Sequence, residues 1–143
     1  MKKVMFSVIG MALLTMAALA DGKPVTYEQL PAPAKSYIEA NFNGENITVA
    51  TKEDDFIRPD YNVLLANGTM LEFSNSGSVK KVASRSGIPA EIVPVTIREY
   101  VAAHYPGAGF LEFEIDRKTY EVKLTNRMEL KFNSNFNVIE VDY

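Results

Sequence analysis

The sequence predicts an α+β fold built from two tandem repeats, each a helical segment followed by four antiparallel strands. Three observations support this prediction. The chain resembles itself when it is shifted by roughly 60 positions. The apolar period of each copy changes from about four to two, and Gly-containing turns separate the alternating runs. We expect an antiparallel sheet of about eight strands with the helices packed on one face.

The internal repeat is found in two segments. With a shift of 63, Leu30-Pro31 falls on Val93-Pro94. With a shift of 59, eight residues over 22 positions match their counterparts: Tyr61, Val63, Leu65, Asn67, Leu71, Phe73, Val79 and Val82 match Tyr120, Val122, Leu124, Asn126, Leu130, Phe132, Val138 and Val141. The change of shift places four extra residues in the first copy, near 54–60. We expect the first repeat at 21–84 and the second at 85–143, with 21–143 forming one compact domain.

Each copy is predicted to open with a helix. Thr26 and Gln29 fit a capping box at the start of a short turn, and a main helix is expected over 31–41. Its apolar stripe consists of Ala34, Ile38 and Phe42, and the stripe of the second copy consists of Ile97, Val101 and Tyr105. Gly44 and Gly107 end the helices, because glycine readily takes the left-handed conformation there.

The strand register follows from side-chain parity. Val63 must lie opposite Leu71, which leaves a three-residue loop that needs a positive φ at Gly68. The same register in the second copy sets Lys123 opposite Glu129 and Glu121 opposite Lys131, as pairs of opposite charge. The other strands are expected at 46–53, 78–84, 109–116 and 137–143. Val79 and Val82 are three apart, which indicates a bulge.

The N-terminal residues have the pattern of a secretory signal peptide over 1–20. Lys2 and Lys3 precede an apolar run over 4–17, and Ala18-Leu19-Ala20 is a cleavage signal. Without those two lysines, 13 basic and 18 acidic residues give the remaining 123 residues a net charge of −5. We expect a periplasmic or secreted protein that does not span a membrane after cleavage. Its acidity argues against nucleic-acid binding, which needs a basic patch.

Several motifs together resemble the PepSY-like domain family. They are the Leu-Pro helix start, the Tyr-x-Val-x-Leu strand at 61–65, the Asn-Gly turn at 67–68, Leu-x-Phe at 71–73, and a Gly before a Val-rich strand. That family shares its architecture with β-lactamase inhibitor proteins and occurs as small exported proteins of gut-type Bacteroidota. The resemblance covers 26–143. It implies two α/β units joined into one curved sheet, in a class whose known inhibitors bind partner proteins.

Few residues in the sequence suggest catalysis or metal binding. The chain has no cysteine, so disulfides, thiolate metal sites and thiol nucleophiles are absent. His104 is the one histidine and aligns with Asn41, so we interpret it as a polar residue near a helix end. No G-x-S-x-G motif is present. The sequence therefore predicts a protein that is not an enzyme, with no catalytic residue, metal ligand or cofactor.

The sequence contains two groups of acidic residues. Glu53-Asp54-Asp55 with Asp60 offers oxygen ligands for calcium but lacks the alternation and central glycine of a calcium loop. We interpret the segment 53–60 as a solvated hairpin loop, with calcium binding as the alternative. Glu112, Glu114 and Asp116 alternate along one strand and are interpreted as a solvated strand face.

The first copy differs from the second at two outward positions, where Leu64 and Met70 replace the pair Lys123 and Glu129. Together with Phe56 and Ile57 they are predicted to form an apolar patch that binds a partner. We therefore expect an exported protein-binding module whose partner is another exported protein. Inhibition of a secreted or periplasmic hydrolase is one form of this function. The alternative is an envelope protein that binds a small ligand or calcium.

Overall fold

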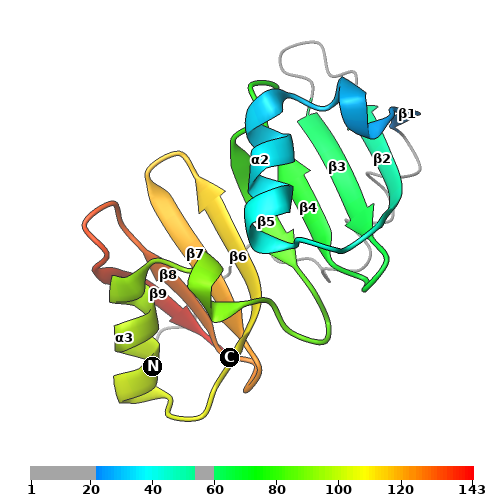
Figure 1. Ribbon diagram of the computed structural model, residues 1–143. Coiled ribbons are helices and arrows are strands. Elements are labelled where there is room, and N and C mark those ends of the chain that lie inside the picture. Colours follow the sequence, from blue (N-terminus) through cyan, green and yellow to red (C-terminus); the bar gives the residue numbers. More distant parts are fainter. Residues whose placement is uncertain (1–21, 54–59) are drawn as a thin grey trace. The chain divides into compact units, whose positions relative to one another are not determined.

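The computed structural model of the 143-residue chain describes residues 22–53 and 60–143. The predicted signal peptide, 1–20, lies outside these residues. The described chain divides into two units, one ending at Val82 and the other running from Ala83 to Tyr143. In each unit a helix lies on one face of antiparallel strands (Figure 1). The predicted α+β class is confirmed.

The first unit begins with a short strand and a 3-10 turn, and its strands follow one another in the sheet in sequence order. Its elements are β1 (Lys23–Pro24), η1 (Tyr27–Gln29), α2 (Ala32–Asn41), β2 (Ile47–Glu53), β3 (Asp60–Leu65), β4 (Met70–Phe73) and β5 (Val79–Ala83). The predicted capping box is present, because the backbone N–H of Thr26 donates to Gln29 Oε1 over 2.8 Å.

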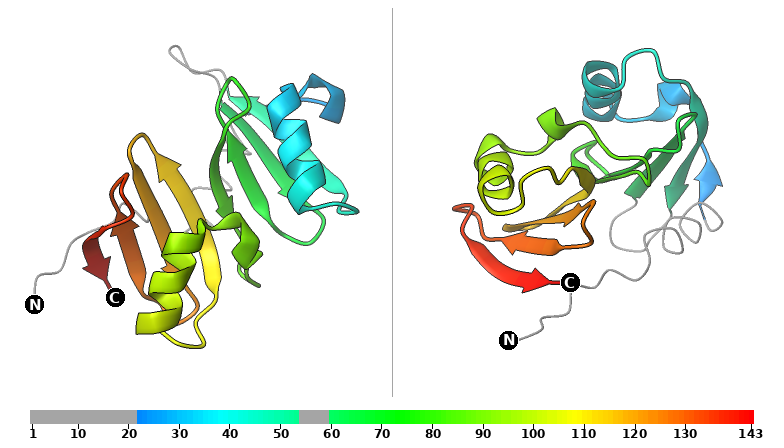
Figure 2. Two further views of the ribbon diagram at one scale, coloured as in Figure 1. Left: turned by 60° about the vertical axis from the view of Figure 1, so that its left-hand side comes forward. Right: turned by 90° about the horizontal axis from the view of Figure 1, so that it is seen from below.

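The second unit repeats this order without a counterpart of β1 (Figure 2). Its elements are η2 (Ala90–Ile92), α3 (Val95–His104), β6 (Phe110–Asp116), β7 (Thr119–Leu124), β8 (Glu129–Phe132) and β9 (Val138–Asp142). Its strands also follow sequence order, and β6–β7, β7–β8 and β8–β9 pair antiparallel.

The predicted helix stripes form the core of each unit. Ala34 and Ile38 of α2 are buried, as are Ile97 and Val101 of α3. These helix residues pack against alternate residues of the strands. The strand residues of the core include several of the largest fully buried side chains, namely Phe73, Phe132, Leu65, Leu71, Leu124, Leu130 and Val63. Burial of these apolar side chains supplies the main driving force for folding each unit.

One aromatic contact between helix and sheet occurs in both units. The Tyr37 ring meets Phe73 edge-on, with centroids 5.9 Å apart and planes at 78°. Tyr100 meets Phe132 in the same way, at 5.6 Å and 87°. Edge-to-face pairs are favoured electrostatically over parallel sandwiches. The repeated contact fixes where each helix lies along its strands.

The register predicted from parity is confirmed in both copies. Val63 pairs with Leu71, and the loop that follows Leu65 carries Gly68 at φ +89°. Lys123 pairs with Glu129 and Glu121 pairs with Lys131. The bulge predicted at Val79 and Val82 has a counterpart in the second copy, where the register between β8 and β9 shifts next to Phe132.

The structure adds one strand that the sequence did not predict. β1 covers the edge of β2, with Lys23 opposite Lys52 and Pro24 opposite Thr51. A strand of two residues gives no alternating pattern, and proline normally argues against a strand. At a sheet edge, however, a proline needs no ladder hydrogen bond for its missing N–H. The described residues therefore form nine strands instead of about eight.

The turn between β4 and β5 lies against the first turn of α2. A Cβ added at Gly77 would meet the Pro31 Cβ at 2.8 Å and the Ala34 backbone nitrogen at 3.0 Å. Gly77 has φ +93°, and its counterpart Phe136 is also left-handed at φ +63°. The turn of the second copy thus accepts a large side chain, whose ring stacks on Tyr120 with centroids 5.0 Å apart. The close approach of α2, more than the turn, requires glycine at position 77.

This contact predicts different costs for two glycine substitutions. Gly68→Ala is expected to lower the free energy of unfolding by about 1–2 kcal/mol, since only the left-handed backbone is penalised and nothing lies within 4 Å of the new Cβ. Gly77→Ala should cost about 1–3 kcal/mol more, because the new methyl group overlaps α2. Urea unfolding of both variants measures the difference. Equal losses would contradict the close approach.

Candidate functional site

The face of the first sheet opposite α2, here called the open face, carries a row of three apolar side chains. Val63 and Leu71 point to the helix, so the alternating neighbours Leu64 and Met70 point to the open face. Leu64 pairs with Met70 on one side and with Val49 on the other. All three members of this apolar row (Val49, Leu64 and Met70) are half-buried. The row is continuous across β2, β3 and β4.

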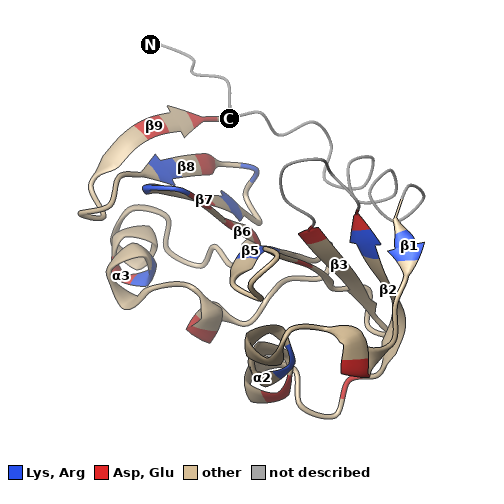
Figure 3. Cartoon of the chain, turned by 90° about the horizontal axis from the view of Figure 1, so that it is seen from above, with Lys and Arg blue, Asp and Glu red and all other residues tan. Residues whose placement is uncertain are grey.

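The second unit has charged residues at the same positions. Glu112 pairs with Lys123, Lys123 with Glu129, and Glu129 with Asp142. Figure 3 shows these strands marked by both signs of charge. An adjacent row runs from Glu114 through Glu121 and Lys131 to Glu140. The same backbone register therefore presents an apolar row in one copy and charged rows in the other.

The charged rows contain more carboxylates than lysines, and the neighbouring negative charges affect the pKa values of the glutamates. Burial raises the pKa of Glu121 above its usual range, while Lys131 opposes the shift and Glu112, Asp116 and Glu140 add to it. Burial likewise raises the pKa of Glu129, opposed by Lys123 and supported by Asp142. The two lysines compensate only part of the negative charge on this face.

The other end of the open face of the first sheet carries an ion cluster. Lys80 Nζ lies 2.8 Å from Asp60 Oδ2 and 3.8 Å from Glu72 Oε1. Burial raises the pKa of Glu72, an effect that Lys80 partly reverses and Asp60 reinforces. The open face thus combines an apolar row at one end with a paired, partly buried charge cluster at the other.

Two short polar side chains lie between these ends. Thr51 and Asn62 pair across β2 and β3, and each is only 2% exposed. Both side chains are therefore shielded from solvent. They are flanked by the longer Leu64, Met70 and Glu72, which can lean over them. In the second unit Glu112 is likewise only 3% exposed, so the interpretation of Glu112, Glu114 and Asp116 as a solvated strand face is wrong at Glu112.

The structure describes two of the four predicted partner-binding residues, Leu64 and Met70. Phe56 and Ile57 lie outside the described residues, as do Asp54 and Asp55 of the acidic loop. The residues on either side of that segment are described, and Glu53 at the end of β2 pairs with Asp60 at the start of β3. The structure brings Leu64 and Met70 together, and their grouping with Phe56 and Ile57 stays a prediction.

His104 is engaged within its own helix. Its Nδ1 lies 2.9 Å from the Tyr100 carbonyl oxygen, and its ring stacks on Tyr100 with centroids 4.0 Å apart. This agrees with a polar residue near a helix end. Within residues 22–53 and 60–143, no group of three or more His, Cys, Asp or Glu side chains is arranged to hold a metal ion. None of the helices in the described part of the chain is long and apolar enough to cross a bilayer.

Comparison with protein families gives a match over residues 18–57 and 59–140 to the family described as beta-lactamase-inhibitor-like and PepSY-like. No curated protein matches this chain. The predicted resemblance is thus confirmed, and it covers nearly all of the described residues.

Solved structures from two Bacteroides species are similar to this chain. One from Bacteroides vulgatus, described as periplasmic, is 39% identical with a TM-score of 0.82, over 86% of this chain and 98% of that one. One from Bacteroides thetaiotaomicron, described as calcium-regulated and periplasmic, is 38% identical with a TM-score of 0.83, over 87% and 98%. A third, from Bacteroides vulgatus and of unknown function, is 26% identical with a TM-score of 0.78, over 85% and 100%. The predicted periplasmic or secreted location agrees with these relatives.

The raised pKa of Glu72 predicts a pH-dependent effect of removing its charge. The folded state holds this proton more tightly than the unfolded chain does, so the carboxylate weakens the fold once the pH exceeds its folded pKa. Glu72→Gln is expected to be more stable than the parent at about pH 8, and the gain should vanish below the usual Glu pKa of 4.5. Thermal unfolding at several pH values measures this. A Glu72→Gln protein that is destabilised at about pH 8 would contradict the sign.

Proposed function

Because this chain belongs to the beta-lactamase-inhibitor-like, PepSY-like family, we propose that it is an exported, non-enzymatic protein-binding module that captures its partner on the open face of the first sheet. The apolar row of Val49, Leu64 and Met70 carries the proposal. It stands where an otherwise equivalent copy has Glu112, Lys123 and Glu129 in the same register. The fold therefore does not need apolar residues at these positions. A binding role would explain why the first copy has them.

The composition of the open face suits a protein partner. Leu64 and Met70 supply the apolar part of the proposed contact, and methionine adapts its shape to a partner surface. Asp60, Glu72 and Lys80 supply a charged margin beside it. An apolar centre with a polar rim is the usual anatomy of a protein–protein interface. The predicted patch extends to Phe56 and Ile57 on the loop between β2 and β3.

Inhibition of a secreted or periplasmic hydrolase is the form of this function that the family description favours. The hairpin loop at 66–68 joins β3 to β4 directly beside the paired Leu64 and Met70. An inhibitor of this kind presents a face and its hairpin loops to the mouth of an enzyme's cleft. The partner is expected to be an exported protein with a complementary apolar surface.

Transplanting the charge pair of the second copy tests the proposal. Leu64→Lys with Met70→Glu reproduces the pair that Lys123 and Glu129 form in the same register, so folding should be retained. Tagged protein is incubated with envelope extract, and captured proteins are compared. We expect the variant to lose the specific partner, with its affinity lowered by about 100-fold or more when two apolar anchors are removed.

The matched control is the reverse transplant, Lys123→Leu with Glu129→Met, which should retain the partner. Circular dichroism and thermal unfolding verify that both variants fold. Unchanged capture by the Leu64/Met70 variant would refute the proposed face. If that variant does not fold, the face is part of the core and the proposal fails as well.

A second candidate function is calcium binding in the envelope. One relative, 38% identical, is described as calcium-regulated. In this chain the segment 53–60 combines Glu53, Asp54, Asp55 and Asp60, whose carboxylates are suitable hard ligands for calcium. Such a protein would respond to the millimolar calcium found outside cells.

Thermal unfolding distinguishes this candidate. Millimolar calcium should raise the melting temperature while equal magnesium does not, because calcium accepts flexible carboxylate sites more readily. Asp54→Asn with Asp55→Asn should abolish the shift, whereas Asp116→Asn in the second copy should leave it intact. Equal shifts with both metals, or a shift that survives in the double variant, would exclude this loop as the site.

A further inference from the structure

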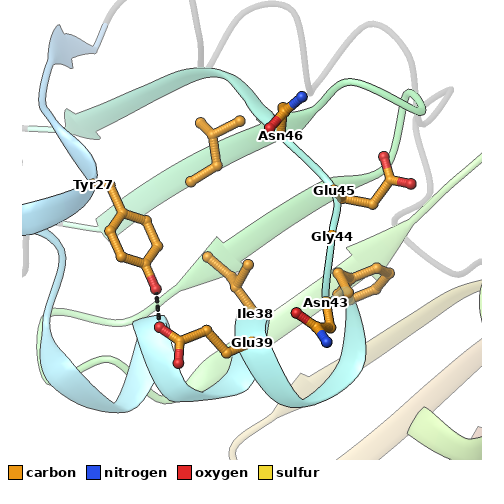
Figure 4. A pocket seen from close by; sticks show the side chains of 9 residues that line it. Tyr27, Ile38, Glu39, Asn43, Gly44, Glu45 and Asn46 are labelled. Carbon is orange, nitrogen blue, oxygen red and sulfur yellow. Dashed lines mark hydrogen bonds between the residues drawn. The ribbon is translucent and has the colours of Figure 1, made fainter.

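We propose that the first unit holds a second binding site, a pocket at the C-terminal end of α2 that takes small organic cations. The pocket is open to one side and has a volume of about 270 Å³. It lies between η1, the end of α2 and the segment that leads into β2 (Figure 4). Its lining includes the polar residues Tyr27, Glu39 and Glu45 and the apolar residues Ile38, Phe42 and Ile47. The site is separate from the open face and does not depend on the function proposed for it.

A hydrogen bond fixes one wall of the pocket. The Tyr27 hydroxyl donates to Glu39 Oε2. Figure 4 shows the two side chains meeting across the gap between η1 and α2, with Ile38 beside them. Because Tyr27 uses only one carboxylate oxygen, Glu39 can accept a further hydrogen bond from an ammonium group. The pair therefore gives the pocket an oriented acceptor on a rigid element.

The electrostatic surroundings favour a cation. Glu39 and Glu45 line the pocket, and no lysine or arginine is among the lining residues. The last carbonyl groups of the ten-residue α2 contribute the negative end of the helix dipole here. The hydrogen bond to Glu39, burial and the nearby charge of Glu28 raise the pKa of Tyr27 to about 12. The surroundings already attract one cation of the chain, since Lys35 Nζ lies 5.9 Å from the centroid of the Tyr27 ring.

The base of the pocket is apolar. Ile38 and Phe42 are 4% and 6% exposed, and Ile47 is half-buried. A ligand that combines an ammonium group with a short hydrocarbon body would contact both parts of the lining. A hydrated metal ion would gain nothing from the apolar base. The chemistry thus points to a small organic amine in its charged form.

The second copy shows that the fold does not require the polar lining. With a shift of 63, the polar residues Tyr27, Glu39, Asn43, Glu45 and Asn46 correspond to Ala90, Ala102, Pro106, Ala108 and Gly109. The base is kept, because Ile38, Phe42 and Ile47 correspond to Val101, Tyr105 and Phe110. One copy therefore retains the packing alone, and the other adds acceptors around an open pocket.

Three four-carbon probes of different charge test the proposal: n-butylammonium, n-butanol and butyrate. Each is titrated into the purified, ¹⁵N-labelled exported protein, and amide shifts are followed by NMR. We expect n-butylammonium to shift Tyr27 and the amides of residues 43–47, and to bind about tenfold more tightly than n-butanol, as one ion pair and a helix terminus together suggest. Butyrate should bind least.

Glu39→Gln with Glu45→Gln should weaken n-butylammonium binding by about tenfold and leave n-butanol unaffected. Glu91→Gln with Glu99→Gln makes the same charge change in the second copy and should have no effect. Both Glu39 and Glu45 are exposed, so folding is expected to survive, and the spectra report it directly. Absence of binding, equal binding of all three probes, shifts spread outside the pocket, or an undiminished double variant would each overturn the proposal.

Discussion

The fold depends on one contact, the packing of a ten-residue helix on a single face of its strands. In the first unit Tyr37 meets Phe73 edge-on, and in the second Tyr100 meets Phe132 with nearly the same geometry. Without cysteines, this apolar layer must supply most of the stability of each unit. Because successive residues of a strand point to opposite faces, burial of one set under the helix commits the other set to the opposite face. The residues of each strand that point away from the helix are therefore not constrained by packing against it.

The two copies carry different residues at these outward-facing positions. Their cores correspond residue by residue, but the outward row of Val49, Leu64 and Met70 in one copy is a row of alternating charge in the other. The end of the helix shows the same division, with polar residues around the pocket in the first copy and Ala, Pro or Gly in the second. An internal duplicate thus serves as a built-in reference, since a position that differs between copies of one fold is not dictated by that fold.

The sequence predicted what periodicity and parity determine. The helices, the hairpin register and the pairing of Lys123 with Glu129 follow from alternation and from the copy-to-copy match, which average over many residues. β1 was missed because two residues, one of them Pro24, carry no pattern. The burial of Thr51 and Asn62 was missed because alternation assigns both residues to the outward face, and spacing does not report what covers that face. The pocket was missed for a related reason: Tyr27 and Glu39 are brought together by the angle between η1 and α2, which no local signal encodes.

The contrast between Gly77 and Phe136 also bears on how such a chain avoids folding errors. Tandem copies of one fold can exchange parts, because a helix from either copy offers a similar apolar stripe to either sheet. In the first copy, however, α2 approaches the β4–β5 turn so closely that only glycine fits there. At the corresponding turn of the second copy the Phe136 ring is stacked on Tyr120. A helix placed on the strands of the other copy would thus face a different turn surface, and glycine at one turn with phenylalanine at the other distinguishes the two helix–sheet combinations.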